Sequence, residues 1–167
     1  MLISSPVQNL ISNTTDKFDP KYGETYIREH SLDEIIVLGV GSERLVVKDP
    51  ITNLAVKISY SEDNLQNKTE YYIYNNCSRS IQRQLLPIIE ADTEGFTYLI
   101  YPSVKQQYEG PRGRHEAFYG PEAERLAQKI KNDGFDIYEL ETAVFRDQVV
   151  AIDYGFLQSP DPTCLKR

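Results

Sequence analysis

The sequence predicts an α+β fold in a single chain of 167 residues. Three apolar runs separated by turn signals fill residues 35–58 and indicate an antiparallel meander. Two more apolar runs, Leu85–Ala91 and Phe96–Tyr101, flank the turn-forming stretch Asp92–Gly95 and indicate a hairpin. Helical spacing of apolar residues then predicts helices over Asn64–Asn76 and Pro121–Asn132. The first half is therefore β-rich, and the second half combines a helix with a hairpin.

Composition excludes several classes of function. Hydrophobic residues make up 40% of the chain, which is enough for a core, and the formal net charge of −7 argues against a nucleic-acid-binding surface. No apolar run reaches the roughly 18 residues of a membrane-spanning helix, and Met1–Asp16 lacks the features of a signal peptide. Cys77 and Cys164 are too isolated for a disulfide framework or a zinc site. We expect a cytoplasmic protein with free thiols that binds neither nucleic acid nor a membrane.

Residues 1–34 are predicted to form an N-terminal arm or helix. Val7, Leu10 and Ile11 fall at helical spacing, so this segment either packs on the body as a short helix or remains a loose arm. Asp16–Tyr26 contains proline, glycine and several charged residues, and is predicted to be a loop.

The stretch Ile35–Ile58 carries the first candidate site. A strand leads into Gly39 and Gly41, a second strand follows, and the third strand holds Lys57. Backbone amides at a glycine-rich turn can approach phosphate oxygens because no Cβ blocks them. A lysine on the adjoining strand could reach the same phosphates. The alternative is an ordinary three-stranded meander with a surface lysine.

This stretch resembles the start of a protein-kinase-like domain. Gly39–Val46 matches the first two glycines and the valine of the family's glycine-rich loop, with Arg44 in place of the third glycine. Leu54–Lys57 matches the lysine motif of the next strand. The resemblance implies a small lobe of antiparallel strands over residues 35–104. It also implies an ATP site that includes Gly39, Gly41, Val46, Ala55 and Lys57.

The same resemblance assigns roles to the next two elements. Glu70, thirteen residues after Lys57, would pair with that lysine and hold it at the phosphates. The alternative is a solvated helix glutamate. Tyr101–Val104 stands where the family has the hinge that binds adenine. Pro102 has no amide to donate, so adenine contacts are expected at Ile100, Tyr101 and Ser103, although a proline also commonly ends a strand.

The resemblance continues near the end of the sequence. Gly134–Asp136 stands in place of the family's H-R-D, Glu141 in place of the catalytic-loop asparagine, and Asp153–Gly155 in place of D-F-G. A hairpin, Ala143–Phe145 with Val149–Ile152, precedes Asp153. The resemblance implies that Asp136 positions an acceptor hydroxyl and that Asp153 and Glu141 hold Mg²⁺. The alternative for Asp136 and Glu141 is a pair of ordinary loop acids.

Residues 105–167 would then form a strongly reduced large lobe, because only residues 156–167 follow Asp153–Gly155. A loop within this part carries a small basic cluster, Arg112, Arg114 and His115. The leading hypothesis is a minimal, ATP- and Mg²⁺-dependent phosphotransferase. The alternative is a pseudokinase, a catalytically inactive kinase-like module that binds a protein partner. A third interpretation is an unrelated small α+β domain without any nucleotide site.

Overall fold

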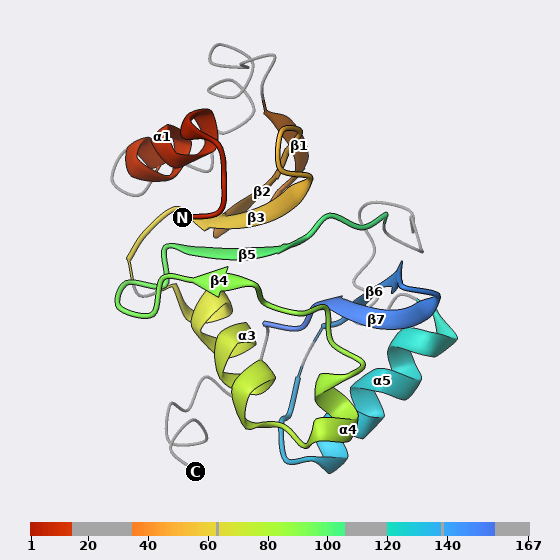
Figure 1. Ribbon diagram of the computed structural model, residues 1–167. Helices are drawn as coiled ribbons and strands as arrows, with labels where there is room; N and C mark the ends of the chain where they lie inside the picture. The colour runs from red at the N-terminus through yellow and green to blue at the C-terminus, as the bar shows by residue number, and fades with distance from the viewer. Residues whose placement is uncertain (15–34, 63, 106–119, 138, 156–167) are drawn as a thin grey trace. The chain divides into compact units, whose positions relative to one another are not determined.

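The computed structural model describes residues 1–14, 35–62, 64–105, 120–137 and 139–155 (Figure 1). The chain divides into two compact units, Met1–Asn67 with Ile88–Ser103, and Lys68–Pro87 with Val104–Arg167. The predicted α+β class is confirmed: the first unit contains a five-stranded antiparallel sheet, and the second combines helices with a two-stranded sheet. The units divide the chain differently from the predicted lobes, because residues 1–14 join the sheet and Lys68–Pro87 joins the second unit.

The sheet of the first unit is a meander with one inserted connection. Its strands lie in the order β1 (Ile36–Val40), β2 (Arg44–Asp49), β3 (Leu54–Ser59), β5 (Tyr98–Pro102) and β4 (Glu90–Ala91). Every neighbouring pair is antiparallel. The predicted meander over residues 35–58 is therefore confirmed, and so is the hairpin around the turn Asp92–Gly95.

Two aspartates stabilise the turns of this sheet. The Asp49 carboxylate accepts hydrogen bonds from the backbone amides of Ile51 at 3.0 Å and Thr52 at 3.4 Å, which closes the β2–β3 turn. The Asp92 carboxylate accepts from the Thr97 amide at 3.1 Å and from the Thr97 hydroxyl at 2.6 Å, across the β4–β5 turn. Aspartate favours such turns because its side chain satisfies amides that no strand can reach.

Helix α1 (Ser5–Thr14) covers one face of the sheet. Its buried residues Val7 and Ile11, together with Ile3, form a core with alternate positions of β2, β3 and β5, namely Leu45, Val47, Val56, Ile58 and Ile100. The helical interpretation of the N-terminal segment is confirmed, and the loose arm is wrong for residues 5–14. The predicted loop Asp16–Tyr26 lies outside the described residues. Packing on one face leaves the other positions of each strand on the opposite face.

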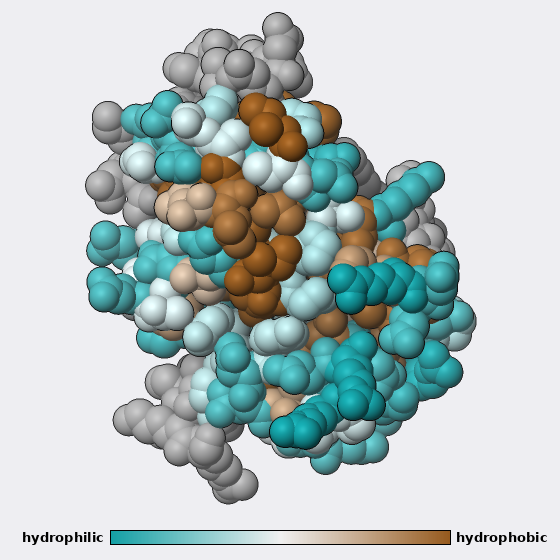
Figure 2. All heavy atoms as spheres, in the orientation of Figure 1, coloured by the Kyte–Doolittle hydropathy of each residue, from teal (hydrophilic) through white to brown (hydrophobic). Residues whose placement is uncertain are grey.

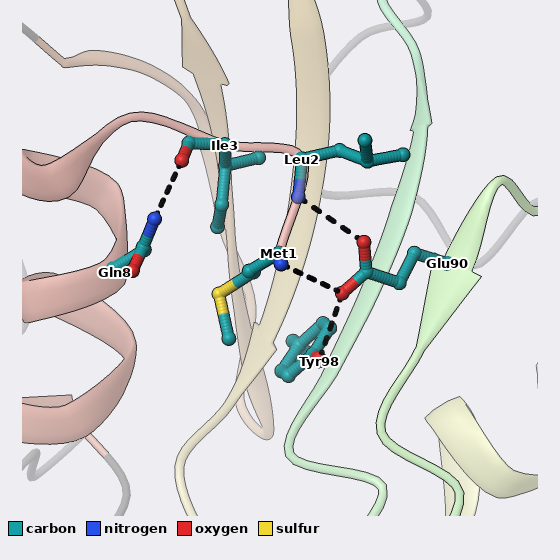
Figure 3. A network of polar contacts seen from close by, with 6 residues as sticks. All are labelled: Met1, Leu2, Ile3, Gln8, Glu90 and Tyr98. Carbon is teal, nitrogen blue, oxygen red and sulfur yellow. Dashed lines mark hydrogen bonds and ion pairs between the residues drawn. The ribbon is translucent and has the colours of Figure 1, made fainter.

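The segment before α1 is attached to the sheet by polar contacts (Figure 3). Glu90 of β4 accepts hydrogen bonds from the Leu2 amide at 3.1 Å and from the Tyr98 hydroxyl at 3.2 Å. The Met1 amino group lies 4.0 Å from the same carboxylate. At the other end of the segment, the Ser4 amide donates to Asp49 at 2.7 Å. These contacts bring α1 over β2 and β3.

The predicted strand Leu85–Ala91 is mostly wrong. Only Glu90 and Ala91 pair with β5. Leu85 instead forms an isolated parallel bridge with Ala151, and its side chain lies in the core of the second unit. Pro87 lacks an amide to donate to a ladder, and the apolar run before it is used for core packing rather than for strand pairing.

The second unit contains most of α3 (Leu65–Asn76), and α4 (Arg79–Gln82), α5 (Pro121–Asn132), β6 (Glu141–Phe145) and β7 (Gln148–Asp153). The predicted helices are confirmed, and α5 has the predicted bounds. Asn64 caps α3 by accepting a hydrogen bond from the Asn67 amide at 3.0 Å. Gly134, with φ of 100°, follows the end of α5. The core of this unit joins these elements through Ile73, Ile81, Leu126, Ile130, Leu140 and Ala151.

The predicted hairpin near the end of the sequence is confirmed with a tighter turn. Arg146 and Asp147 have φ of 50° and 61°, which is the conformation of a two-residue type I′ turn. Gln148, expected in the turn, pairs instead with Phe145 as the first residue of β7.

Candidate functional site

The sheet register gathers the predicted nucleotide-binding residues on one face. Val46 lies opposite both Gly39 and Lys57, and Ala55 lies opposite Tyr101. Directly opposite residues share a face, and so do Ala55 and Lys57, two residues apart on β3. Gly39, Val46, Ala55, Lys57 and Tyr101 therefore occupy the face of the sheet that α1 does not cover.

Lys57 is a buried lysine, with 7% of its side chain exposed. Its ammonium nitrogen lies 5.2 Å from the centroid of the Tyr101 ring, within the range of a cation–π contact. Burying an ammonium group is costly unless other groups compensate the lost hydration. The alternative of a surface lysine is therefore wrong.

The glycine-rich turn is closed by its own hydrogen bonds. The Gly41 amide donates to the Arg44 carbonyl at 2.9 Å, and the Tyr60 hydroxyl donates to the Gly41 carbonyl at 3.1 Å. The Ser42 and Glu43 amides donate to no described residue. Amides available to a phosphate group would therefore be those of Ser42 and Glu43, at the tip of the turn, rather than that of Gly41. The sequence pattern drew attention to Gly39 and Gly41 and did not single out the backbone amides of Ser42 and Glu43.

The fold itself does not require glycine at position 39 or 41. A Cβ at Gly39 would meet no atom within 4 Å, and a Cβ at Gly41 would lie 3.4 Å from the Arg44 carbonyl oxygen, which is ordinary contact. Neither residue has a positive φ, in contrast to Gly134. The backbone of β1 and its turn is therefore open to the approach of another group.

Arg44, which replaces the third glycine of the family's loop, is not at the tip of the turn. It is the first residue of β2 and is almost fully buried. Its guanidinium donates to the Asn67 side-chain oxygen at 3.2 Å, and the Asn67 amide group donates to the Phe96 carbonyl at 2.9 Å. The arginine therefore connects β2 to the start of α3, and its side chain leaves the turn unobstructed.

The expected hinge residues are already engaged within the sheet. Pro102 is the last residue of β5 and lies opposite Leu54. The Ser103 amide donates to the Asn53 carbonyl at 3.3 Å, which is long for a backbone hydrogen bond, and the Ile100 carbonyl accepts from the Ile89 amide at 2.8 Å. An adenine that used the Ser103 amide would have to replace the long bond to Asn53.

Glu70 is fully buried in α3. The alternative of a solvated helix glutamate is therefore wrong. A buried carboxylate needs hydrogen-bond donors or a positive charge, because transfer of an unpaired charge out of water costs many kcal/mol. Burial makes Glu70 a candidate partner for a cation.

The two predicted metal ligands lie opposite each other in the hairpin of the second unit. Glu141 of β6 is the Cα partner of Asp153 of β7, while Thr142 is the partner of Ala151, so Ile152 forms a β-bulge. Residues opposite each other in an antiparallel pair have Cβ atoms about 4.5–5.5 Å apart. The bulge therefore places two partly exposed acidic residues at opposite positions of neighbouring strands.

Asp136 lies in the connection that follows α5. Its side chain is 62% exposed, and one carboxylate oxygen lies 3.8 Å from the Lys131 ammonium nitrogen. The next residue, Ile137, is fully buried and anchors the connection to the core. The carboxylate is therefore accessible on a fixed backbone. The basic cluster of Arg112, Arg114 and His115 lies outside the described residues.

The two carboxylates of Glu141 and Asp153 would suit Mg²⁺, which can take further ligands from a phosphate group, better than a metal ion whose ligands all come from the protein. Within the described ranges, no group of three or more His, Cys, Asp or Glu side chains could hold a metal ion. Mg²⁺ commonly uses one or two carboxylates together with substrate phosphates. Glu141 and Asp153 would supply two such carboxylates on neighbouring strands.

Comparison with known proteins adds no family. The sequence matches no protein-family model, and a search of curated proteins finds no significant match. In the part of the chain that the structure describes, no helix has the length and apolar character needed to cross a membrane.

Proposed function

We propose that this chain is a minimal protein-kinase-like phosphotransferase that uses ATP and Mg²⁺. The observation that carries the proposal is the face of the first unit's sheet, where Val46, Ala55, Lys57 and Tyr101 lie together opposite the face covered by α1. Ala55 and Tyr101 are buried apolar neighbours of a buried ammonium group, and a nucleotide combines a flat base with negatively charged phosphates. The proposal places the chain in the cytoplasm.

In this proposal the first unit binds the nucleotide. Lys57 holds phosphate oxygens, and the amides at the tip of the glycine-rich turn donate to them. Val46 and Ala55 contact the base, and Tyr101 and Ser103 provide the backbone beside it. The proposal keeps for Glu70 the role that the resemblance implies, which is to orient the lysine that binds the phosphates.

The second unit provides the acidic groups. Asp153 and Glu141 would hold Mg²⁺, which would supply positive charge for the transferred phosphoryl group. Asp136 orients the acceptor hydroxyl and takes its proton. Phosphoryl transfer depends mainly on positioning and charge stabilisation, so each carboxylate is expected to contribute strongly.

The proposal is tested by ATP turnover with and without Mg²⁺. We expect ADP formation that depends on Mg²⁺ in the wild type and falls about a hundredfold or more in Asp153→Ala. Asp147→Asn, in the exposed turn of the same hairpin, is the control and should retain turnover, because asparagine tolerates the positive φ of this position. Turnover that is equal in the wild type and Asp153→Ala would contradict the assignment of the metal site.

A second candidate is an inactive kinase-like module that binds a protein partner. Glu43 places an exposed carboxylate at the turn tip, where it would repel phosphate, and Glu141 replaces an asparagine. Figure 2 shows apolar side chains gathered over β3, β5 and β4 of the first unit, and the exposed apolar residues of that unit include Met1, Leu2, Ile51 and Ile89. Exposed apolar patches commonly mark interaction surfaces. Partner binding that survives Asp153→Ala, without ATP turnover, would favour this candidate.

A further inference from the structure

A pocket of about 420 Å³ lies in the second unit, away from the residues assigned to the nucleotide and metal. Side chains from the end of α3, the region of α4 and the β6–β7 hairpin line it, including Tyr74, Arg83, Leu85, Phe145, Arg146 and Val150. Its volume is within the range of small-molecule binding sites. Nothing in the proposed function uses it.

The walls of this pocket are connected to one another by hydrogen bonds. The Gln82 side chain donates to the Tyr74 carbonyl at 2.9 Å, which links α4 to α3. The Ala151 amide donates to the Gln84 carbonyl at 2.8 Å, and the Leu86 amide donates back to the Ala151 carbonyl at 2.8 Å. These two bonds attach the chain after α4 to β7. The pocket is therefore formed by the fold and does not depend on an isolated loop.

Two guanidinium groups border the pocket without any acidic neighbour among its lining residues. Neither Arg83 nor Arg146 forms an ion pair with another described residue. The Arg146 guanidinium lies 5.0 Å from the centroid of the Phe145 ring, so a cation–π contact holds it at the pocket wall. In a chain with a net charge of −7, this is a local site for a negatively charged group.

The remaining lining residues favour a ring beside that charge. Leu85 and Val150 give an apolar surface, and Tyr74 and Phe145 present aromatic rings. Aromatic side chains pack well against another ring in stacked or edge-to-face arrangements. An inorganic anion would leave this surface unused, and a neutral ring would leave both arginines without a counter-charge.

We propose that this pocket binds an aryl phosphate. The phosphate dianion lies between Arg83 and Arg146, since two guanidinium groups match its charge and can each donate two hydrogen bonds to it. The aromatic ring packs against Tyr74 and Phe145. The same chemistry is present in a free aryl phosphate and in a phosphotyrosine side chain. This proposal does not depend on the nucleotide site, because all of its residues belong to the second unit.

The test is an NMR titration of the ¹⁵N-labelled full chain with phenyl phosphate, with inorganic phosphate and benzyl alcohol as partial probes. We expect phenyl phosphate to bind about tenfold more tightly than either partial probe, with shifts at pocket residues. Arg83→Gln and Arg146→Gln should each weaken it about tenfold or more. Arg125→Gln on α5 removes an exposed arginine outside the pocket and should leave the affinity within about twofold.

The source of the phosphate is distinguished by a second probe, N-acetyl-phosphotyrosine amide. Tighter binding than phenyl phosphate would indicate a phosphotyrosine side chain, and weaker binding a free aryl phosphate. The proposal is overturned if phenyl phosphate shifts no pocket residue or binds no better than inorganic phosphate. It is also overturned if Arg125→Gln weakens binding as much as the two pocket variants do.

Discussion

Glu141 and Asp153 are opposite each other on β6 and β7 because a β-bulge at Ile152 shifts the register by one residue. In a regular ladder Glu141 would face Ile152 instead. Two carboxylates at directly opposite positions repel each other, and a cation between them removes that repulsion. Bulges commonly redirect a side chain beside a functional site. This relationship is the structural basis of the proposed metal site.

Mg²⁺ or Mn²⁺ should bind this hairpin mainly in the presence of nucleotide. Two carboxylates alone hold such a metal weakly, and phosphate oxygens complete its coordination. We expect Mn²⁺ electron paramagnetic resonance to detect tight binding with ATP and little without it. Glu141→Gln and Asp153→Asn should each weaken the nucleotide-dependent binding about tenfold or more, because each loses one charged ligand.

The matched control for the metal site is Asp147→Asn in the turn of the same hairpin. Asp147 is exposed, and asparagine tolerates its positive φ of 61°. This variant should bind Mn²⁺ as the wild type does. Equal losses in Asp147→Asn and Asp153→Asn would mean that the hairpin attracts the metal only through its general charge.

Gly41→Ala should separate the stability of the fold from nucleotide binding. A Cβ fits at this position, so the free energy of unfolding should stay the same or rise by about 0.5–1 kcal/mol. ATP binding should weaken, because the Cβ occupies space that phosphate oxygens would approach. Urea unfolding and ATP titration of the same preparation measure both effects.

Gly134→Ala provides the opposite control. Gly134 has φ of 100°, which disfavours any residue with a Cβ, so unfolding should become easier by about 1–2 kcal/mol. The folded fraction should still bind ATP with unchanged affinity. If Gly41→Ala destabilised the chain as much as Gly134→Ala and left ATP affinity intact, the glycine turn would have only a structural role.

Asp49→Ala should destabilise the protein in a pH-dependent way. Burial raises the pKa of Asp49, but hydrogen bonds from Ser4, Thr52 and Ile51 more than offset this, so the pKa lies below its ordinary value. A depressed folded-state pKa stabilises the fold above the unfolded pKa of about 3.9, and that contribution is lost as the pH falls through the folded value.

The measurement for Asp49 is urea unfolding at pH 7 and at pH 3 or below. We expect Asp49→Ala to cost about 1–3 kcal/mol at pH 7, because three backbone or side-chain donors lose a charged acceptor. The difference from wild type should narrow as the pH falls through the folded-state pKa of Asp49, because the wild-type carboxylate then becomes protonated. A difference that stayed constant across this range would show that the carboxylate charge is not the source of the stability.

Ile11→Ala should show how much the sheet depends on α1. Ile11 is buried against the sheet, and its truncation should lower the free energy of unfolding by about 2–5 kcal/mol. Ile51→Ala removes an equal volume from a side chain that is 69% exposed and should change stability by less than about 0.5 kcal/mol. Similar effects in thermal unfolding of the two variants would argue against packing of α1 on the sheet.

Elements with their own local signals could be predicted from the sequence. Pro121 at the first helical position and Gly134 after the last turn delimit α5, and the predicted bounds of that helix are the observed ones. Asp92 and Gly95 indicate a turn, and the structure shows Asp92 accepting the amides that the turn exposes. In each case the interaction that fixes the element is local in sequence.

Features that depend on distant contacts could not be predicted in this way. The run from Leu85 has the composition of a strand, but its side chains are needed in the core of the second unit. The bulge at Ile152 changes the pairing of Asp153 without any marking in the sequence. The burial of Lys57 and Glu70 also comes from tertiary packing, although the resemblance to kinase motifs had already singled them out as candidate site residues.

The most direct test of the central claim is calorimetric titration of ATP, with and without Mg²⁺, into the wild type and Lys57→Ala. Lys57 lies on the sheet face assigned to the nucleotide and supplies its buried positive charge. We predict Mg²⁺-dependent binding to the wild type that is lost in Lys57→Ala, with both proteins folded by circular dichroism. Absence of ATP binding to the wild type, or equal binding to both proteins, would contradict the proposed nucleotide site.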